Sequence, residues 1–135
     1  MLYKNAKEFE LDYAKKWYAR FGLVSYGCCE PLHNKIDVIR EIPNLRKISM
    51  SPWVDLEKGA ERIGNDYVFA RKPNPAYLAV NSWDPDIVKK DLKDTLQICN
   101  HYGCTVQFIL KDISTVKYQP QRLFEWADLA MKIVS

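Results

Sequence analysis

The feature that most constrains the fold is a regular alternation of strand-like and helix-like segments. Four short runs of apolar and β-forming residues each give way to a segment with helical periodicity. These runs occupy residues 23–28, 45–50, 67–70 and 105–110. Strands that alternate with helices pair in parallel through right-handed crossovers, and runs this apolar are typical of strands covered on both faces. The sequence therefore predicts an α/β chain of four β/α units with parallel strands.

Helical periodicity and capping residues place the helices. A leading helix carries Phe9, Tyr13, Trp17 and Phe21 at intervals of four, so we expect this aromatic face to cover the sheet. Shorter helices are expected at residues 35–41 and 55–63, and a long one between Asp84-Pro85 and Gly103. A final helix begins at Pro120, with these residues expected to point inward: Leu123, Trp126, Ala127, Ala130, Met131 and Val134.

The chain of 135 residues is expected to form a single domain. Residues 1–22 form its leading helix and residues 23–135 its four β/α units. Four β/α units make either a small open sheet or half of an eight-stranded barrel. A complete barrel of this type needs about 250 residues. The leading helix, with no strand before it, favours a missing upstream segment. A half-barrel has two unpaired strand edges, so we expect a homo-oligomer or a complementary half-barrel as its partner.

Composition excludes several classes of protein. The net charge is only +3 with charged residues scattered along the chain, which argues against a nucleic-acid binder. No apolar run approaches the ~20 residues of a membrane span, and the N-terminus lacks a secretory segment, so no membrane partner and a cytoplasmic location are expected. The spacing of the cysteines is typical of neither a disulfide framework nor a zinc knuckle. Cys99 and Cys104 continue apolar patterns and are expected in the core.

Metal-capable side chains cluster directly after the first predicted strand. Cys28, Cys29, Glu30 and His33 lie within six residues. Thiolate, carboxylate and imidazole are all zinc ligands, and a catalytic zinc needs three of them with one position open. We therefore consider Cys28, Glu30 and His33, with Cys29 as a further candidate, as a metal site. The alternative is structural: one cysteine packs in the core and His33 caps a loop.

Polar residues also follow the other three strands. Because the carboxyl ends of parallel strands meet at one edge, all four sets are expected on one rim, where α/β proteins hold substrates. The later strands contribute these residues: Ser51 and Trp53; Arg71, Lys72 and Asn74; Lys111, Asp112 and Ser114.

Basic residues on this rim predict a site for a carboxylate or phosphate. Arg71 and Lys72, joined by Lys111, would hold the anion, with Ser51, Trp53 and Asn74 as further substrate contacts. The alternative is an internal ion pair of Arg71 or Lys111 with Asp112 or Glu30. Trp53 is either a stacking wall for a flat ligand or a residue that closes the core. Asp112 and Lys111 are the candidate catalytic groups.

Three segments carry a resemblance to a known family. FGLVSYGCCEPLHNKIDVIREIPNLRKISMSPWVD, DYVFARKPNP, and FILKDISTV with the RLFEWADLAM helix together resemble the C-terminal half of the uroporphyrinogen decarboxylase superfamily. Within it, the chain is most similar to the branch of corrinoid-dependent methyltransferases of anaerobic metabolism. The resemblance implies a (β/α)8 TIM barrel, of which this chain supplies the last four units.

The resemblance also implies a chemistry. In the methyltransferase branch, zinc activates a thiol acceptor that takes a methyl group from a corrinoid protein. The family's zinc motif is His-x-Cys plus a later Cys. Its first Cys falls on Cys28, whereas the His position falls on Tyr26 and the later Cys position on Lys111-Asp112. From their chemistry, and not from a family pattern, we infer that Cys29, Glu30 and His33 could substitute as a local set. The substrate motifs of the decarboxylase itself are absent, which argues against a porphyrinogen substrate.

The sequence leads to three functional hypotheses. The first is zinc-assisted methyl transfer between a corrinoid protein and a small acceptor, by an enzyme that needs a second copy or the other half-barrel. The second is a non-catalytic half-barrel that serves as an assembly or binding module. The third is a metal-independent decarboxylase or lyase of a small carboxylate, with the basic trio as anion site and Asp112 as acid or base.

Overall fold

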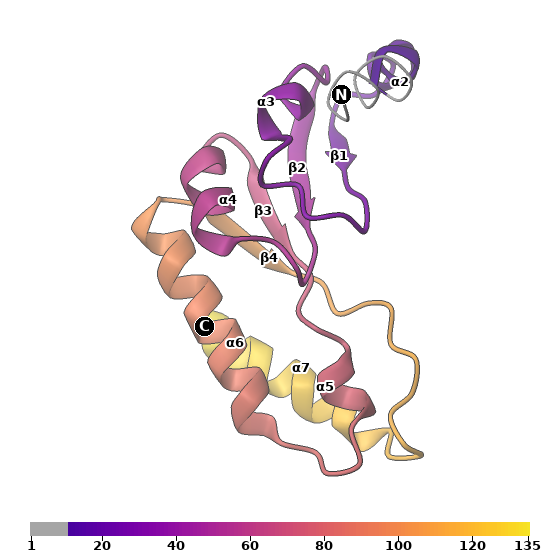
Figure 1. Ribbon diagram of the computed structural model, residues 1–135, viewed down its shortest axis with the longest axis vertical. Coiled ribbons are helices and arrows are strands. Elements are labelled where there is room, and N and C mark those ends of the chain that lie inside the picture. The colour runs from indigo at the N-terminus through magenta and orange to yellow at the C-terminus, as the bar shows by residue number, and fades with distance from the viewer. Residues whose placement is uncertain (1–10) are drawn as a thin grey trace.

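A computed structural model describes residues 11–135 and confirms the predicted α/β class, with four strands in one all-parallel sheet that alternate with helices (Figure 1). The expected position Phe9 lies outside the described residues. The elements run in the following order: α2 Asp12–Tyr18, β1 Val24–Tyr26, α3 Ile36–Ile39, β2 Leu45–Met50, α4 Leu56–Ile63, β3 Val68–Arg71, α5 Ala76–Ala79, α6 Pro85–His101, β4 Thr105–Phe108 and α7 Gln121–Val134. None of the helices within residues 11–135 is both long and apolar enough to cross a bilayer.

The order of the strands follows the order of the chain. β1 pairs with β2, β2 with β3 and β3 with β4, always in parallel, and Ser49, Ala70 and Gln107 lie in register across the last three strands. Each crossover therefore returns to the neighbouring strand, an arrangement consistent with half of a β/α barrel preceded by a helix. All four carboxyl ends meet at one edge of the sheet as a result.

One face of the sheet is buried under helices. Ile48, Met50 and Phe69 are fully buried, and Ile63 of α4 and Cys99 of α6 belong to the same core cluster. Figure 1 shows α3, α4 and α6 on this side of the sheet. Burial of such large apolar side chains contributes about 1.5–3 kcal/mol each, so this face supplies most of the stability of the sheet.

The opposite face of the sheet is polar, contrary to the expectation of cover on both faces. Ser25, Thr105 and Gln107 are exposed there, and Lys47 Nζ donates a hydrogen bond of 3.1 Å to Gln107 Oε1. The sequence of β4, Thr-Val-Gln-Phe, alternates polar and apolar residues, so it can bury only one side. Within the described residues, no helix covers this face.

A second core joins α5, α6 and α7. Leu78, Leu92 and Trp126 are buried in it, with Val88 and Ala130. Inward positions are correctly predicted for Trp126, Ala130 and the partly buried Leu123. Three other residues were expected inward and are exposed, because α7 contacts α6 through a narrow face only. The three exposed residues are Ala127, Met131 and Val134.

One further expectation is corrected, and one helix was not expected. The aromatic face of α2 does not cover the sheet: Tyr13, Trp17 and Phe21 are exposed, whereas Leu11 is buried. The four-residue helix α5 follows a proline-rich segment and is too short to produce a periodic pattern. Asn74 Oδ1 stabilises its start by accepting a hydrogen bond of 3.0 Å from the Ala76 N–H.

Arg122 links α7 to the segment after α5. The residue is 1% exposed, and its guanidinium donates hydrogen bonds to the backbone carbonyls of Leu78, Val80 and Asn81 at 2.9, 2.6 and 3.1 Å. Its Nε donates to Gln119 Oε1 at 3.0 Å. Leu78 lies near the end of the short helix α5 and the other two residues follow it, so Arg122 supplies donors to carbonyls at and beyond a helix end.

We expect Arg122→Met to lower the free energy of unfolding by about 2–4 kcal/mol, because the three carbonyls lose their donor while the packed volume is kept. Urea denaturation followed by circular dichroism measures this. Lys132→Met, at an exposed position of the same helix, is the matched control and should change little. Equal stabilities for the two variants would contradict the role given to Arg122.

Candidate functional site

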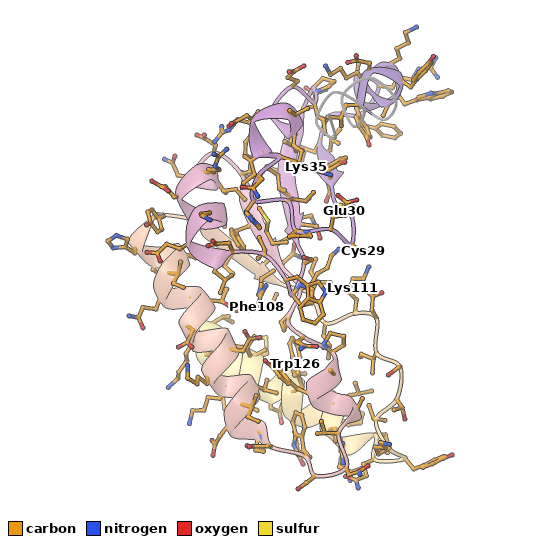
Figure 2. All side chains as sticks on the ribbon, viewed as in Figure 1. Cys29, Glu30, Lys35, Phe108, Lys111 and Trp126 are labelled. Carbon is orange, nitrogen blue, oxygen red and sulfur yellow. The ribbon has the colours of Figure 1, made fainter. Side chains whose placement is uncertain are left out.

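A pocket of about 340 Å³ lies at the carboxyl ends of the strands, within the size range of ligand sites. Seven of the predicted site residues line it, together with Ser114: Cys29, Ser51, Trp53, Lys72, Asn74, Lys111 and Asp112. Figure 2 shows Cys29 and Lys111 at this end of the sheet. Residues that follow all four strands therefore meet, as the parallel topology requires.

Lys72 is the buried cation of the pocket. The residue is 8% exposed, and its ammonium donates one hydrogen bond, to the carbonyl oxygen of Cys28 at 3.2 Å. Its backbone N–H continues the pairing of β2 and β3 by donating to Met50 at 2.8 Å. Within residues 11–135, no carboxylate forms an ion pair with this ammonium. Two of its three N–H donors are thus available to a ligand.

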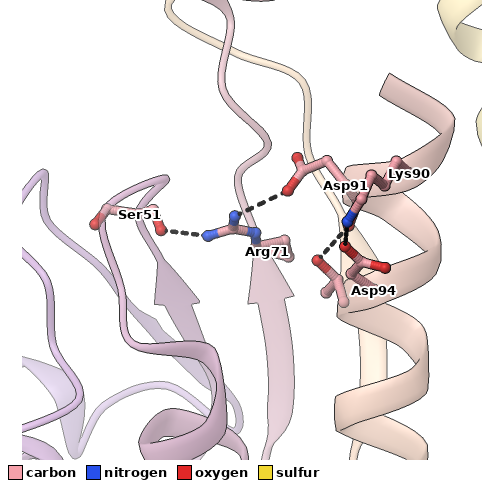
Figure 3. Close-up of polar contacts among 6 residues, drawn as sticks. Ser51, Arg71, Lys90, Asp91 and Asp94 are labelled. Carbon is pink, nitrogen blue, oxygen red and sulfur yellow. Dashed lines mark hydrogen bonds and ion pairs between the residues drawn. The ribbon is translucent and has the colours of Figure 1, made fainter. Parts of the chain in front are cut away.

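Ser51 carries an unsatisfied hydroxyl in the pocket wall. The residue is 1% exposed, and its Oγ has no hydrogen-bond partner among the described residues. Its carbonyl oxygen faces the other way and accepts a hydrogen bond of 2.7 Å from Arg71 Nη1 (Figure 3). Because a buried hydroxyl without a partner costs stability, a ligand oxygen that accepts from it would be stabilising.

Arg71 does not line the pocket. Its guanidinium lies on the helix-covered side, where Nη2 is 3.4 Å from Asp91 Oδ1 of α6 (Figure 3). Arg71 is therefore in an internal ion pair, with Asp91 as the partner in place of Asp112 or Glu30, whereas the Lys111–Asp112 pair weighed from the sequence is present. Asp91 was not singled out in the sequence. The signal that could have found it is its position next to Leu92, which is buried.

Lys111 and Asp112 lie together at the outer wall of the pocket. Their side chains form an ion pair of 3.3 Å and are both partly open to solvent. The backbone of Asp112 has a φ of 58°, in the left-handed region that aspartate tolerates better than most residues. Left-handed backbone conformations of non-glycine residues are enriched at functional sites, where they point a side chain in a direction that regular secondary structure does not allow.

Trp53 and Asn74 complete the walls. Trp53 is exposed and borders the pocket, so its indole does not close the core. The Asn74 carboxamide oxygen accepts a hydrogen bond from the Ala76 N–H. The NH2 group is therefore the part of this side chain that can donate to a ligand.

The predicted metal ligands are not gathered around one point. Glu30 forms an ion pair with Lys35 (Figure 2), and His33 Nδ1 accepts a hydrogen bond of 3.2 Å from the Asp55 N–H at the start of α4. Cys28 is half-buried against the main core, and only Cys29 borders the pocket. Across residues 11–135, no three His, Cys, Asp or Glu side chains are placed to hold a metal. The residues present therefore do not fit a catalytic zinc.

Burial makes the other two thiols unreactive. Desolvation raises the pKa of Cys99 to about 12, and burial also raises the pKa of Cys104. Cys104 Sγ lies 3.3 Å from the carbonyl oxygen of Ala60. Both residues belong to the core cluster, where they act as small apolar side chains.

We expect Cys29 to be alkylated by iodoacetamide at pH 8 before any other cysteine, because it is the exposed thiol of the pocket. With a pKa of about 12, Cys99 has a thiolate fraction of about one in ten thousand at this pH, so it should react only after unfolding. Peptide mass spectrometry of timed samples identifies the sites. Labelling of Cys99 or Cys104 at the rate of Cys29 in the folded protein would refute this assignment.

Gly27 lets the loop that carries the paired cysteines approach β2. A Cβ atom at this position would lie 2.4 Å from the Ser49 Cβ, closer than any real contact. The chain can therefore turn from β1 toward Cys28 and Cys29 only where a side chain is absent.

We expect Gly27→Ala to destabilise the fold by about 1–3 kcal/mol, since the new methyl group must push β1 and β2 apart. Gly22→Ala is the matched control, because a Cβ there meets no atom within 4 Å. Thermal unfolding of the two variants measures the difference. An unchanged melting temperature for Gly27→Ala would contradict the close approach of the two strands.

We compared the chain with protein-family models, curated proteins and solved structures, and none of them matches. The resemblance to the uroporphyrinogen decarboxylase superfamily therefore stays a prediction. The geometry of the pocket is the evidence on which a function can be proposed.

Proposed function

We propose that this chain binds a small organic anion, a carboxylate in the first instance, in the pocket at the strand ends. The observation that carries the proposal is the buried ammonium of Lys72, which has a carbonyl partner but no carboxylate within the described part of the chain. A buried charge without a counter-ion is costly, and an anionic ligand in the pocket would supply the missing charge.

The neighbouring groups support the same ligand. The Ser51 hydroxyl has no partner among the described residues, and it lines the same pocket as Lys72. An oxyanion that accepts from both would satisfy two buried donors at once, and hydrogen bonds to a charged group are the strong ones. Lys111 adds a second ammonium against the single carboxylate of Asp112, so the pocket lining is net positive.

The apolar part of the lining selects for an organic ligand over a bare ion. Trp53, the prolines at positions 52, 73 and 75, and Ala79 of α5 border the pocket. Ligand pockets of this kind combine apolar walls with a few polar groups that fix orientation. The proposal is therefore an organic acid whose carbon skeleton contacts Trp53 and Ala79.

A lyase acting on the bound acid is the reaction class that one further observation favours. Asp112 lies at the pocket with a left-handed backbone and a carboxylate partly open to solvent. In this reaction the two lysines would hold the carboxylate of the substrate, and Asp112 would move a proton. Zinc-assisted methyl transfer from a corrinoid protein stays a prediction, and Cys28, Glu30 and His33 as placed do not support it.

Titration with malonate and with inorganic phosphate, followed by proton–nitrogen NMR, tests the binding. Lys72→Met should weaken malonate binding about tenfold or more, since a hydrogen bond to a charged group contributes about 1.5–3 kcal/mol. Ser51→Ala should also weaken binding without loss of stability, because its hydroxyl has no partner to lose. Lys93→Met, at an exposed position of α6, is the control and should bind as the unmodified chain does. Binding unchanged in Lys72→Met would overturn the proposal.

A further inference from the structure

Helix α7 exposes an apolar stripe that nothing in the described part of the chain covers. Phe124, Ala127, Met131 and Val134, here called the α7 stripe, follow one another at intervals of three, four and three residues. All four are exposed, and Met131 is 65% exposed. This spacing is typical of a helix face that packs on another helix.

A second apolar stripe lies at the opposite end of the molecule. Tyr13 and Trp17 of α2, with Phe21 just after it, form this α2 stripe, and Trp17 is 63% exposed. Figure 1 shows α2 beside β1 at one end and α7 far from it at the other. Large exposed aromatic residues in a row are unusual for a free surface and mark a contact with another chain.

The α2 stripe and the α7 stripe lie on elements that are next in the chain to the two edge strands of the sheet. α2 leads directly into β1, and α7 follows β4. Within residues 11–135, these are the outermost strands of the sheet. The outer side of an edge strand is a template on which another strand can pair. Both edges run in the same direction, because all four strands are parallel, so one edge can continue the pairing of the other.

We propose that a second copy of this chain covers both ends. β4 of one copy pairs in parallel with β1 of the other, and the α7 stripe packs against the α2 stripe at this junction. A two-fold axis along the barrel repeats the junction and closes eight strands into one barrel. Each junction thus joins the β4 edge and the α7 stripe of one copy to the β1 edge and the α2 stripe of the other.

Size and charge favour this partner. The small Ala127 leaves space between Phe124 and Met131 for a large ring such as that of Trp17. Exposed Lys16 and Arg20 flank the α2 stripe, and the α7 stripe has exposed Asp128 next to Ala127 and exposed Lys132 next to Met131, so Asp128 supplies an anion that these two cations can pair with across the junction. The polar sheet face with Lys47 and Gln107 would become the barrel interior, and both anion pockets would open at the same end.

Light scattering after size exclusion of the full chain tests the proposal. The mass expected is twice the 15.8 kDa of one chain. Met131→Lys places a cation in the apolar contact and near Lys16 and Arg20, and Trp17→Glu places an anion in the same contact and near Asp128, so each variant alone should be monomeric. A monomeric unmodified chain would overturn the proposal.

Mixing the two variants separates a specific interface from misfolding. In an equimolar mixture, a dimer of one Met131→Lys chain and one Trp17→Glu chain has two junctions. One junction pairs the new lysine with the new glutamate and the other is unmodified, so the mixture should recover the dimer mass. Ile87→Lys changes an exposed apolar residue of α6 outside both stripes and should stay dimeric. Variants that stay dimeric alone, or a mixture that stays monomeric, would overturn the assignment of the α2 and α7 stripes.

Discussion

Parallel pairing of the four strands is the constraint on which the rest of the structure depends. Because each strand must be reached by a crossover, the helices gather on one face and the carboxyl ends of all strands share one edge. Side chains far apart in the sequence, such as Cys29 and Lys111, meet there for this reason alone. Within residues 11–135, the same topology leaves β1 and β4 with a neighbouring strand on one side only, and no helix covers the face with Lys47.

The three cations that are buried within residues 11–135 have different hydrogen-bond partners, and these partners distinguish scaffold residues from a binding group. Arg122 is satisfied by backbone carbonyls, and Arg71 is held by a carbonyl and the carboxylate of Asp91. Lys72 has one carbonyl and no carboxylate among the described residues. The two guanidinium groups are part of the scaffold because they are bound to fixed protein oxygens, although Arg71 Nε has no partner among the described residues. The Lys72 ammonium lines the pocket with the unpartnered Ser51 hydroxyl, which makes it the binding group.

Much of the fold and the place of the site were predictable from local signals. The strand at residues 45–50, the Asp84 cap and the polar strand ends follow from periodicity and capping, which act over a few residues. The direction in which a side chain points depends on packing between distant elements, so local signals did not decide between the ligand-binding and the structural roles weighed for Arg71 and His33. The exposed face of α7 was missed for the same reason, since apolar residues look alike whether the chain or a partner covers them.

A crystal structure of the chain grown with malonate tests the central claim most directly, because it locates the anion. We expect a malonate carboxylate within hydrogen-bond distance of both Lys72 Nζ and Ser51 Oγ, with its carbon atoms against Trp53. A pocket without the anion at saturating malonate, or a Lys72 ammonium paired with a carboxylate of the protein itself, would contradict the proposed anion site.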